Sequence, residues 1–358
     1  MPALAIPTSL DDLTPAWLTA ALQAAGVAES PVATATIEPL GAESGFLCQT
    51  VRVCLTYAAG GRQGPASVVA KLPSADPRVR SVIHSFGFYE REAKFYAAFS
   101  EANPLRPPGS YFAAYDATTK DTCVLLEDIS DDLLDNGEDL TLPPSLALEF
   151  AQRLGAFHAQ HWGRSPEGLG WLTPFVDHQP DAAGLANRWQ RLQERNGHVI
   201  PDAFHAQASD FVRHAHTFAQ ALSEHPRTLV HGDLRVGNVL VARDGLRVVD
   251  WQTVAWGRGG LDLGFFLTQV YTPEQRRALE PTVVPAYQQA LVDHGVTGYG
   301  LDRCWDDYRL GHLRVATMFV QAGSSLDMSG PRSQQLLANS LERAAAAMLD
   351  LKPFDLLR

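Results

Sequence analysis

The chain has 358 residues, of which 46% are hydrophobic and 19% charged, and its formal net charge is −11 at pH 7. This length allows about two domains, and the composition is typical of a soluble globular protein rather than a disordered one. The acidic balance, without a basic stripe of interleaved aromatic residues, argues against a nucleic-acid partner.

Neither a secretory signal nor a membrane span is visible in the sequence. Residues 1–30 include Asp11 and Asp12 and have no apolar run after a basic start, and no apolar stretch is long enough to cross a bilayer. The four cysteines are scattered without a Cys-x-x-Cys pair, as expected for reduced thiols. We therefore expect a cytoplasmic protein with no membrane partner, and the sequence leaves the oligomeric state open.

The hydrophobic pattern changes period along the chain. Thr14 and Pro15 are typical of a helix start. After it, alternating patterns predict strands over residues 35–40, 48–57, 67–72, 111–115 and 122–127, with a helix over 89–99. From residue 128 onward the pattern is helical, over 144–162, 182–195, 205–224, 259–270, 273–294, 302–324 and 330–350. The fold class predicted is α+β, with a small strand-rich lobe (1–127), a hinge near 125–131 and a larger helical lobe (128–358).

Polar residues follow apolar strand-like runs in the second half of the chain. The sequence His231-Gly-Asp233-Leu-Arg-Val-Gly-Asn238 comes after one such run, and Asp250-Trp-Gln252 ends another. A carboxylate that accepts a proton, together with an amide and a carboxylate that bind metal, is the set that phosphoryl transfer from a magnesium nucleotide needs. The alternative is a plain hairpin of turn-forming residues. That alternative explains Asp244-Gly245, but it explains neither His231-Gly-Asp233 nor the position of Asp250.

Lys71 is one of only four lysines, and it lies inside the apolar run Val68-Val-Ala-Lys-Leu. Burying an ammonium group costs several kcal/mol unless an anion accompanies it. Nucleotide phosphates plus a carboxylate from the following helix would satisfy Lys71, and we favour Glu92 over Glu90. The alternative is an edge-strand lysine that points into water.

Two further segments could contact a nucleotide. The loop Gly41-Ala-Glu-Ser44-Gly45-Phe46 has small residues that would let backbone N–H groups approach phosphates, although it is not a Walker A sequence and could be an ordinary turn. The linker through Glu127 and Ile129 could offer backbone groups to a base between two lobes, or could simply connect them.

Three other polar residues lie on predicted helices. His158 and His161 are adjacent on a helix surface, but no third zinc ligand is evident, so we interpret them as structural. Asp262 stands near a helix start, where it could cap that helix or anchor it near the hairpin.

These motifs together resemble the aminoglycoside phosphotransferase and choline kinase-like superfamily, the small-molecule relatives of the protein kinases. Within it, the likeness is greatest to the ecdysteroid-kinase-like and bacterial phosphotransferase-family branch. The resemblance covers nearly the whole chain and is most specific at His231-Gly-Asp-Leu-Arg-Val-Gly-Asn238 and Val249-Asp-Trp-Gln252. It implies a bilobal, protein-kinase-like fold with a small antiparallel-sheet lobe.

The resemblance also implies roles for the site residues. Asp233 would be the catalytic base, with His231 supporting its loop and Arg235 either steadying the γ-phosphate or capping the loop. Asn238 and Asp250 would bind Mg²⁺. The nucleotide would be held by the remaining residues: Lys71 paired to Glu92 on the α- and β-phosphates, Gly41, Ser44, Gly45 and Phe46 over the phosphates, and backbone groups of Glu127 and Ile129 on adenine. Asp262 would brace the catalytic loop.

The function expected is ATP- and Mg²⁺-dependent phosphorylation of a hydroxyl group on a small molecule. An apolar run, Thr317-Met-Phe-Val-Gln, favours a sterol-like, hydroxyacyl or other alcohol as acceptor. Glu342 and Asp350 leave open an antibiotic kinase for aminoglycosides or macrolides. A nucleotide-binding pseudokinase is the alternative of another class, although the base, the metal ligands and the lysine are all present.

Overall fold

The computed structural model describes residues 4–40, 48–134, 142–164, 169–178 and 181–357. By their internal contacts the residues form two compact units. Unit 1 comprises Met1–Asp135 and Leu240–Val254, and unit 2 comprises Asn136–Val239 and Ala255–Arg358. This grouping assigns the hairpin around residue 244 to unit 1. The lobe boundary near residue 127 stays a prediction.

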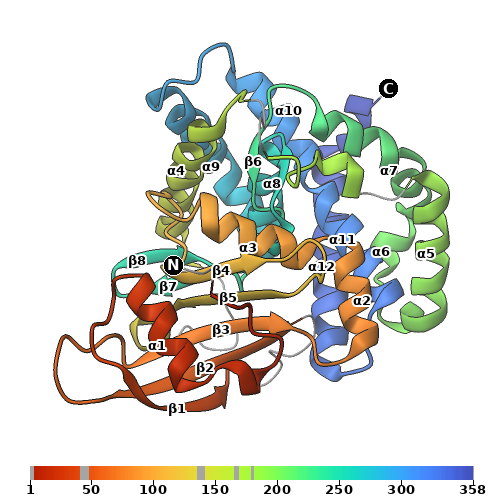
Figure 1. Cartoon of the computed structure of the whole chain (residues 1–358). Helices are drawn as coiled ribbons and strands as arrows, with labels where there is room; N and C mark the ends of the chain where they lie inside the picture. The colour runs from red at the N-terminus through yellow and green to blue at the C-terminus, as the bar shows by residue number, and fades with distance from the viewer. Residues whose placement is uncertain (1–3, 41–47, 135–141, 165–168, 179–180, 358) are drawn as a thin grey trace. The chain divides into compact units, whose positions relative to one another are not determined.

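Unit 1 is built on an antiparallel five-stranded sheet of order β1-β2-β3-β5-β4 (Figure 1). Its strands are β1 (Val32–Pro39), β2 (Cys48–Tyr57), β3 (Ser67–Pro73), β4 (Ser110–Tyr115) and β5 (Thr122–Glu127). Its helices are α1 (Pro15–Ala24), α2 (Pro77–Ser85) and α3 (Phe88–Ala98). A hairpin of β7 (Val239–Ala242) and β8 (Gly245–Val248) and the short turns η1 (Leu10–Asp12), η2 (Ser130–Asp132) and η5 (Trp251–Thr253) complete the elements of this part of the chain.

The two faces of this sheet pack against different helices. Successive side chains of a strand point to opposite faces, and Val53, Val68 and Ala70 share one buried core with Leu18 of α1. Lys71, next to Ala70, therefore points to the other face, against which α3 packs. The alternation of β3 thus directs the buried lysine towards α3.

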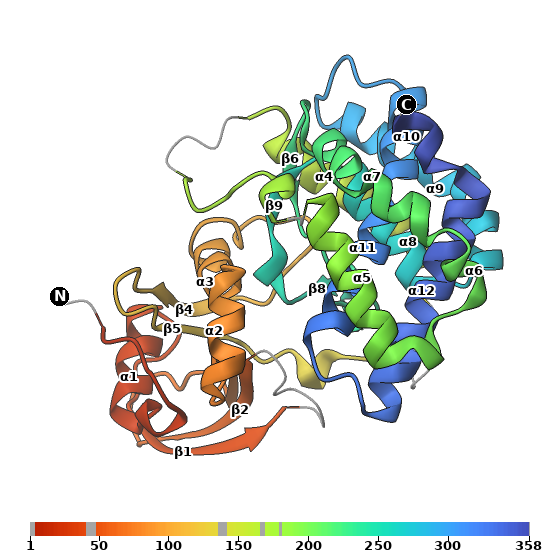
Figure 2. The same cartoon turned by 90° about the vertical axis from the view of Figure 1, so that its right-hand side faces the viewer.

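Unit 2 is mainly helical (Figure 2). Its helices are α4 (Pro144–His161), α5 (Ala182–Asn196), α6 (Asp202–His205), α7 (Ala208–Ser223), α8 (Gly260–Val270), α9 (Pro273–Asp293), α10 (Leu301–Gly311), α11 (Leu313–Ser325) and α12 (Pro331–Leu351). Two short strands, β6 (Thr228–Val230) and β9 (Ala255–Gly257), pair antiparallel. The remaining turns are η3 (Phe175–His178), η4 (Gly197–Val199) and η6 (Pro353–Leu357).

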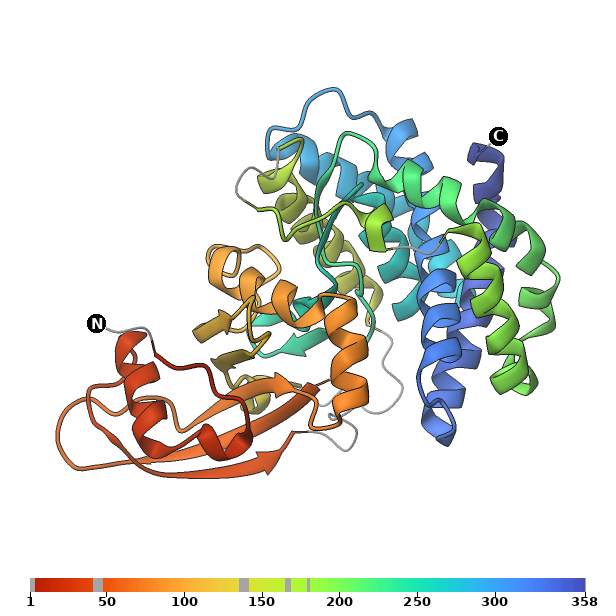
Figure 3. The same cartoon turned by 45° about the vertical axis from the view of Figure 1, so that its right-hand side comes forward.

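Helix α8 lies at the centre of unit 2, because every one of its residues is buried. Most of its residues are apolar, and a helix buried around its whole circumference belongs to a core. Helices α9, α10, α11 and α12 all contact it, and α11 packs in turn against α5 and α12 (Figure 3). A polar side chain on α8 is therefore held from several sides.

Most predicted elements are found close to their predicted positions. Thr14 accepts a hydrogen bond from the N–H of Trp17, as a cap should. The hairpin of β7 and β8 is also found, with its turn at Arg243-Asp244, one residue before the predicted tip. The prediction of an antiparallel sheet followed by a mostly helical part is confirmed.

The prediction was wrong in three places. Helix α2 was not predicted, although Asp76 caps it and Pro77 begins it. The predicted helix 205–224 corresponds to α7, but the predicted helix 302–324 is two helices, α10 and α11, which divide at His312. Strand β9 was missed because three residues carry too little pattern to be recognised.

No helix in the ranges given above combines the length and apolarity that a membrane crossing requires.

Helices α8 and α10 approach each other through glycines. A Cβ atom added to Gly311 would lie 2.0 Å from the carbonyl oxygen of Gly260, and one added to Gly260 would lie 2.3 Å from the carbonyl carbon of Asp307. Both contacts are with backbone atoms, which cannot rotate away. The absence of a side chain at these positions therefore determines how closely the two helices pack.

We predict that Gly311→Ala lowers the free energy of unfolding by about 1–3 kcal/mol, since the added methyl overlaps backbone. In an unobstructed helix the same change would instead stabilise by about 0.5–1 kcal/mol. Urea unfolding followed by circular dichroism measures the difference. Gly197→Ala is the matched control, because its Cβ would meet no atom within 4 Å. Equal stability of the two variants would contradict the packing argument.

Candidate active site

Lys71 of β3 forms two ion pairs within unit 1. Its Nζ contacts the carboxylate of Glu92 on α3 and lies 2.9 Å from Asp250 Oδ1. The Lys71 side chain is only 11% exposed and that of Glu92 5%, so the charges are largely removed from water. Glu90 pairs with Lys94 instead. The partner of Lys71 is therefore Glu92, which the sequence favoured, together with a second carboxylate.

The two carboxylates keep Lys71 charged. Burial alone would lower the pKa of Lys71, but the negative charges of Asp250 and Glu92 outweigh it and raise that pKa well above its ordinary value. A permanently protonated ammonium group can bind anionic oxygens at any physiological pH.

Asp250 is held in an unusual backbone conformation. Its φ is +68°, in the left-handed region that residues other than glycine seldom adopt. The next residue, Trp251, is fully buried and stacks on Phe95 of α3 with ring centroids 3.9 Å apart. Gln252 Nε2 donates to Asp250 Oδ2 at 3.0 Å. The stacked rings anchor this turn on the helix that also carries Glu92.

In unit 2, Asp262 accepts two hydrogen bonds from the backbone of the predicted catalytic loop. The N–H of His231 lies 2.6 Å from Asp262 Oδ2, and the N–H of Gly232 lies 2.7 Å from Oδ1. Gly232 has a φ of +81°, which explains why a glycine separates His231 from Asp233. Asp262 is not a simple helix cap, because it fixes the start of the loop from the first turn of α8.

A second layer of contacts supports Asp262. His158 Nε2 lies 3.3 Å from Asp262 Oδ2, and His158 Nδ1 lies 2.7 Å from the hydroxyl of Tyr287 on α9. All three side chains are fully buried. This arrangement gives His158 a structural position behind the loop. Among the described residues, no cluster of three or more His, Cys, Asp or Glu side chains could bind a metal ion.

Asp233 is fixed by its neighbours in the loop. Its N–H donates to His231 Nδ1 at 3.2 Å, and Asn238 Nδ2 donates both to the Asp233 carbonyl (2.8 Å) and to Oδ2 (3.0 Å). Arg235 Nε lies 3.4 Å from the same Oδ2. Asp233 is only 6% exposed. Its hydrogen bonds therefore largely determine the orientation of its carboxylate before any ligand binds.

The same bonds fix the orientation of the Asn238 amide. Because its amide nitrogen faces Asp233, its Oδ1 is directed away from that residue. Amide and carboxylate oxygens are the ligands that Mg²⁺ accepts, usually with phosphate oxygens completing the sphere. The Oδ1 of Asn238 in unit 2 and the carboxylate of Asp250 in unit 1 therefore have the right donor chemistry for this ion.

The linker residues are partly occupied within unit 1. The N–H of Glu127 donates to Gly109 O at 2.7 Å, and its carboxylate accepts from Gly109 N at 3.1 Å and pairs with Arg247 at 3.5 Å. The carbonyl of Ile129 accepts from Asp132, whereas the Ile129 N–H has no acceptor among the described residues. The predicted phosphate cover, Gly41, Ser44, Gly45 and Phe46, lies outside the described residues.

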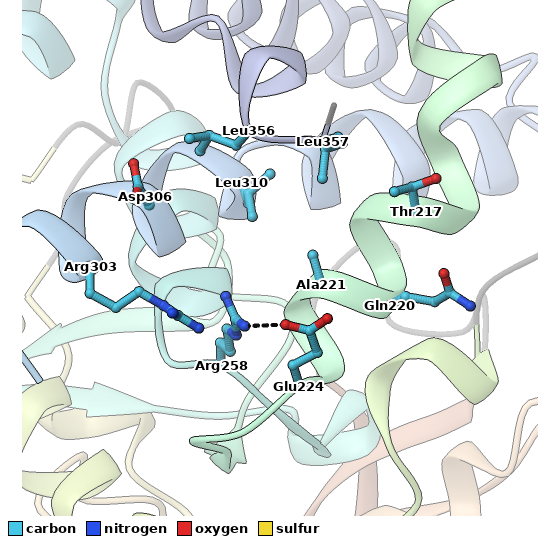
Figure 4. Close-up of a pocket in the computed structure, with 10 residues that line it drawn as sticks. All are labelled: Thr217, Gln220, Ala221, Glu224, Arg258, Arg303, Asp306, Leu310, Leu356 and Leu357. Carbon is cyan, nitrogen blue, oxygen red and sulfur yellow. Dashed lines mark hydrogen bonds and ion pairs between the residues drawn. The ribbon is translucent and has the colours of Figure 1, made fainter.

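A separate pocket of about 390 Å³ lies in unit 2 between α7, α10 and η6 (Figure 4). Arg258 enters it and binds Glu224, with Nη2 2.6 Å from Oε2. None of the residues predicted from the motifs lines it. The pocket residues are Thr217, Gln220, Ala221, Glu224, Arg258, Arg303, Asp306, Leu310, Leu356 and Leu357.

Comparison with known proteins identifies the family. The sequence profile of the phosphotransferase enzyme family matches residues 55–315, which include both ion-pair partners of Lys71 and the whole loop from His231 to Asn238. The chain belongs to this family. The predicted aminoglycoside phosphotransferase and choline kinase-like superfamily is therefore confirmed, and the narrower branch stays a prediction.

One named relative matches only part of the chain in sequence. Methylthioribose kinase from Geobacillus kaustophilus (strain HTA426) is 29% identical over 150 residues, which are 39% of this chain and 30% of that protein. The chain thus matches less than a third of that relative's length.

Several solved structures resemble most of the chain in fold. A microcompartment-associated aminopropanol kinase covers 95% of this chain and 99% of its own at 18% identity and a TM-score of 0.57. A putative aminoglycoside phosphotransferase from Ralstonia eutropha JMP134 (14%, TM-score 0.54) covers 94% and 97% of the two chains. Choline kinase from Cryptosporidium parvum Iowa II (10%, TM-score 0.52) covers 90% and 92%. These likenesses confirm the predicted protein-kinase-like fold.

Two buried residues that take part in these contacts were missed from the sequence. Tyr287 lies in the middle of a long helix and gives no sequence signal. Arg314 of α11 donates from Nε to the carbonyl of Gly232 at 3.1 Å. It stands alone in the apolar run Leu313-Arg-Val-Ala, the same signal that singled out Lys71, so it could have been found.

We predict that Asp262→Ala lowers the free energy of unfolding by about 2–5 kcal/mol, because it leaves two buried N–H groups without an acceptor. Asp262→Asn should cost less, since its carbonyl still accepts one bond. Urea unfolding measures both. Asp302→Asn, in the exposed first turn of α10, is the control and should change stability by no more than about 0.5 kcal/mol. An Asp262→Ala protein as stable as the control would contradict the role of Asp262.

Asp128 should make stability depend on acid pH. Burial alone would raise the pKa of Asp128, but hydrogen bonds from Arg52, Ser130 and Ser67 lower it from 3.8 to about 2. A depressed folded-state pKa stabilises the protein above about pH 4, and that contribution is lost as the pH falls towards 2. We predict that Asp128→Asn costs about 1–2 kcal/mol at pH 7, allowing for solvent at Arg52.

In urea unfolding series from pH 7 to pH 3, the difference in stability between wild type and Asp128→Asn should stay nearly constant down to about pH 5 and shrink below about pH 4. Asp131→Asn is the matched control: Asp131 also pairs with Arg52, at 2.9 Å, but its side chain is 91% exposed. The free energy of unfolding of Asp131→Asn should differ little from that of wild type at any pH. A pH-independent difference for Asp128→Asn would count against the charge-based explanation.

Proposed function

We propose that the protein transfers the γ-phosphoryl group of ATP to a hydroxyl group of a small molecule. The observation that carries this proposal is the loop from His231 to Asn238, in which Asp262 fixes the backbone and Asn238 orients the Asp233 carboxylate. Phosphoryl transfer requires little covalent work from an enzyme and much positioning. A rigid, pre-oriented carboxylate suits that requirement.

Asp233 is the base in this proposal. The acceptor oxygen forms a bond to the γ-phosphorus while the bond from that phosphorus to the β–γ bridging oxygen breaks. ADP leaves, and the hydroxyl proton passes to the carboxylate of Asp233. Arg235, partly exposed beside Asp233, can steady the transferring group. His231 accepts the N–H of Asp233 and so maintains the loop.

The nucleotide is held by residues of unit 1 in this proposal. Lys71 binds the α- and β-phosphates while Glu92 positions its ammonium group. The N–H of Ile129 and backbone groups of Glu127 serve adenine. Gly41, Ser44, Gly45 and Phe46 cover the phosphates.

Magnesium is the second cofactor that we propose. Asn238 Oδ1 and the Asp250 carboxylate would hold it, and when bound it neutralises phosphate charge. Asp250 already sits at the Lys71 ammonium, so the metal and lysine would act on the same phosphates.

The acceptor is a small molecule with a free hydroxyl group. The relatives named above act, by their names, on methylthioribose, aminopropanol and choline, which supports the class but not a specific compound. A sterol-like, hydroxyacyl or other alcohol remains our proposal. The run at residues 317–321 gives it little support, because Thr317, Phe319 and Val320 are buried in the core. Asp350 binds Arg276 and Arg277 and is therefore occupied within the protein.

We expect Asp233→Asn to reduce phosphorylation about 10²- to 10⁴-fold, the usual contribution of a general base, with nucleotide affinity nearly unchanged. Hydroxylated compounds are first screened for ATP consumption, and products are identified by mass spectrometry. Asp302→Asn controls for the loss of one surface carboxylate and should retain full activity.

Retained turnover in Asp233→Asn would reject Asp233 as the base. Binding of ATP without phosphorylation of any compound in a broad screen would favour the pseudokinase alternative. Preferential phosphorylation of polycationic aminoglycosides would favour the antibiotic kinase.

A further inference from the structure

Arg314 is a buried cation next to the proposed base. It lies in the first turn of α11 and is 7% exposed. Its Nε donates to the carbonyl of Gly232, the residue before Asp233, at 3.1 Å. Its guanidinium carbon lies 5.3 Å from the centre of the Phe175 ring. These two contacts, both within unit 2, fix the position and plane of the guanidinium group.

The two terminal nitrogens of this guanidinium group make no hydrogen bond within the described part of the chain. Among the described residues, neither Nη1 nor Nη2 of Arg314 has a hydrogen-bond acceptor, and neither nitrogen is fully enclosed. Two other buried arginines of unit 2 differ in this respect. Arg258 places Nη1 2.9 Å from Asp307 and Arg276 binds Glu280. A buried guanidinium group without a carboxylate partner is costly, and an anion from outside would offset that cost.

Two nearby carboxylates, those of Asp233 and Asp262, favour the charged form of Arg314. Burial lowers its pKa to about 10, and the carboxylates of Asp233 and Asp262 oppose that shift. Arg314 is therefore still a cation at neutral pH, and it lies within the electrostatic field of Asp233. Asp262 is satisfied by two backbone N–H groups and does not need Arg314 as a partner.

We propose that Arg314 is an acceptor-binding residue that holds an anionic group of the acceptor beside Asp233. This proposal rests on the proposed kinase function and narrows its substrate class to hydroxylated compounds that also carry a carboxylate or a phosphate. The two terminal N–H groups of an arginine match the two oxygens of such a group. The bound anion would place the acceptor hydroxyl close to the base.

The same cation disfavours ammonium acceptors. An amino group brought to this position would meet a like charge with little water between them, which is strongly unfavourable. The γ-phosphate of the nucleotide is the other possible source of an oxyanion. We favour the acceptor because Arg235 of the same unit, which is partly exposed and lies 3.4 Å from Asp233 Oδ2, is already the cation offered to the γ-phosphate in the proposed reaction.

The experiment compares acceptors that differ only in charge. Glycerate, glycerol and aminopropanediol share one skeleton, and lactate, propylene glycol and isopropanolamine form a second series. Turnover is measured by mass spectrometry, and binding by saturation-transfer NMR with MgADP present. For wild type we expect kcat/KM and affinity to be about ten- to a hundredfold higher for the anionic member, as one charge-assisted bond gives.

The variants separate charge from structure. Arg314→Gln should lose the preference for the anionic member, mainly through KM, while Arg314→Lys should keep part of it. Arg343→Gln is the matched control, because Arg343 also donates from a helix to a backbone carbonyl, that of Gln269. It should leave the preference unchanged whatever its effect on stability.

Three outcomes would overturn the proposal. The first is that wild type binds or phosphorylates the neutral or cationic member best. The second is that Arg314→Gln keeps the anionic preference, as a purely structural arginine would. The third is that Arg314→Gln weakens ATP relative to ADP and leaves acceptor preference intact, which would assign Arg314 to the γ-phosphate. If no member is phosphorylated, the kinase proposal loses support, and the binding series still decides the role of Arg314.

Discussion

The N–H groups of His231 and Gly232 both donate to the carboxylate of Asp262, which lies fully buried in the first turn of α8. A buried charge is tolerated only where it is fully hydrogen-bonded, so this carboxylate restricts the loop to one geometry. His158 and Tyr287 continue the network away from the loop. The position of Asp233 thus depends on α4, α8 and α9 together. The close packing of α8 against α10 at Gly260 and Gly311 also helps to fix the position of Asp262.

Two buried cations show how the same physical cost leads to different roles. Lys71 is compensated inside unit 1 by two carboxylates, one of which, Asp250, also belongs to the proposed metal site. Arg314 has a backbone carbonyl and an aromatic ring, and the remaining compensation is open to a ligand. In the proposed reaction, Lys71 and Arg314 would bind the two substrates separately. Asp233, oriented by Asn238, would accept the proton of the acceptor hydroxyl.

Much of the site could be predicted because its chemistry is local in sequence. His231, Asp233 and Asn238 occupy one short loop, and a single lysine in an apolar strand requires an anionic partner wherever it is buried. The change from alternating to helical periodicity likewise predicted a sheet followed by a helical part. Predictions failed where the signal was short or where helices continued into each other, as at His312. There, close contact with neighbouring helices rather than intrinsic propensity decides where one helix ends.

By itself, the sequence indicated the type of reaction that we propose, since the residue types that phosphoryl transfer needs lie close together along the chain. It also predicted the family and most of the strands and helices. Only the tertiary structure decided how those residues are held. It joins Asp262 to His158, 104 positions away, and Arg314 to Gly232, 82 positions away. Contacts between residues so far apart depend on how complete helices pack, and helix packing is set by the shapes of many side chains at once. For that reason the proposed base was evident from a motif, whereas the contact that holds Arg314 beside it was not.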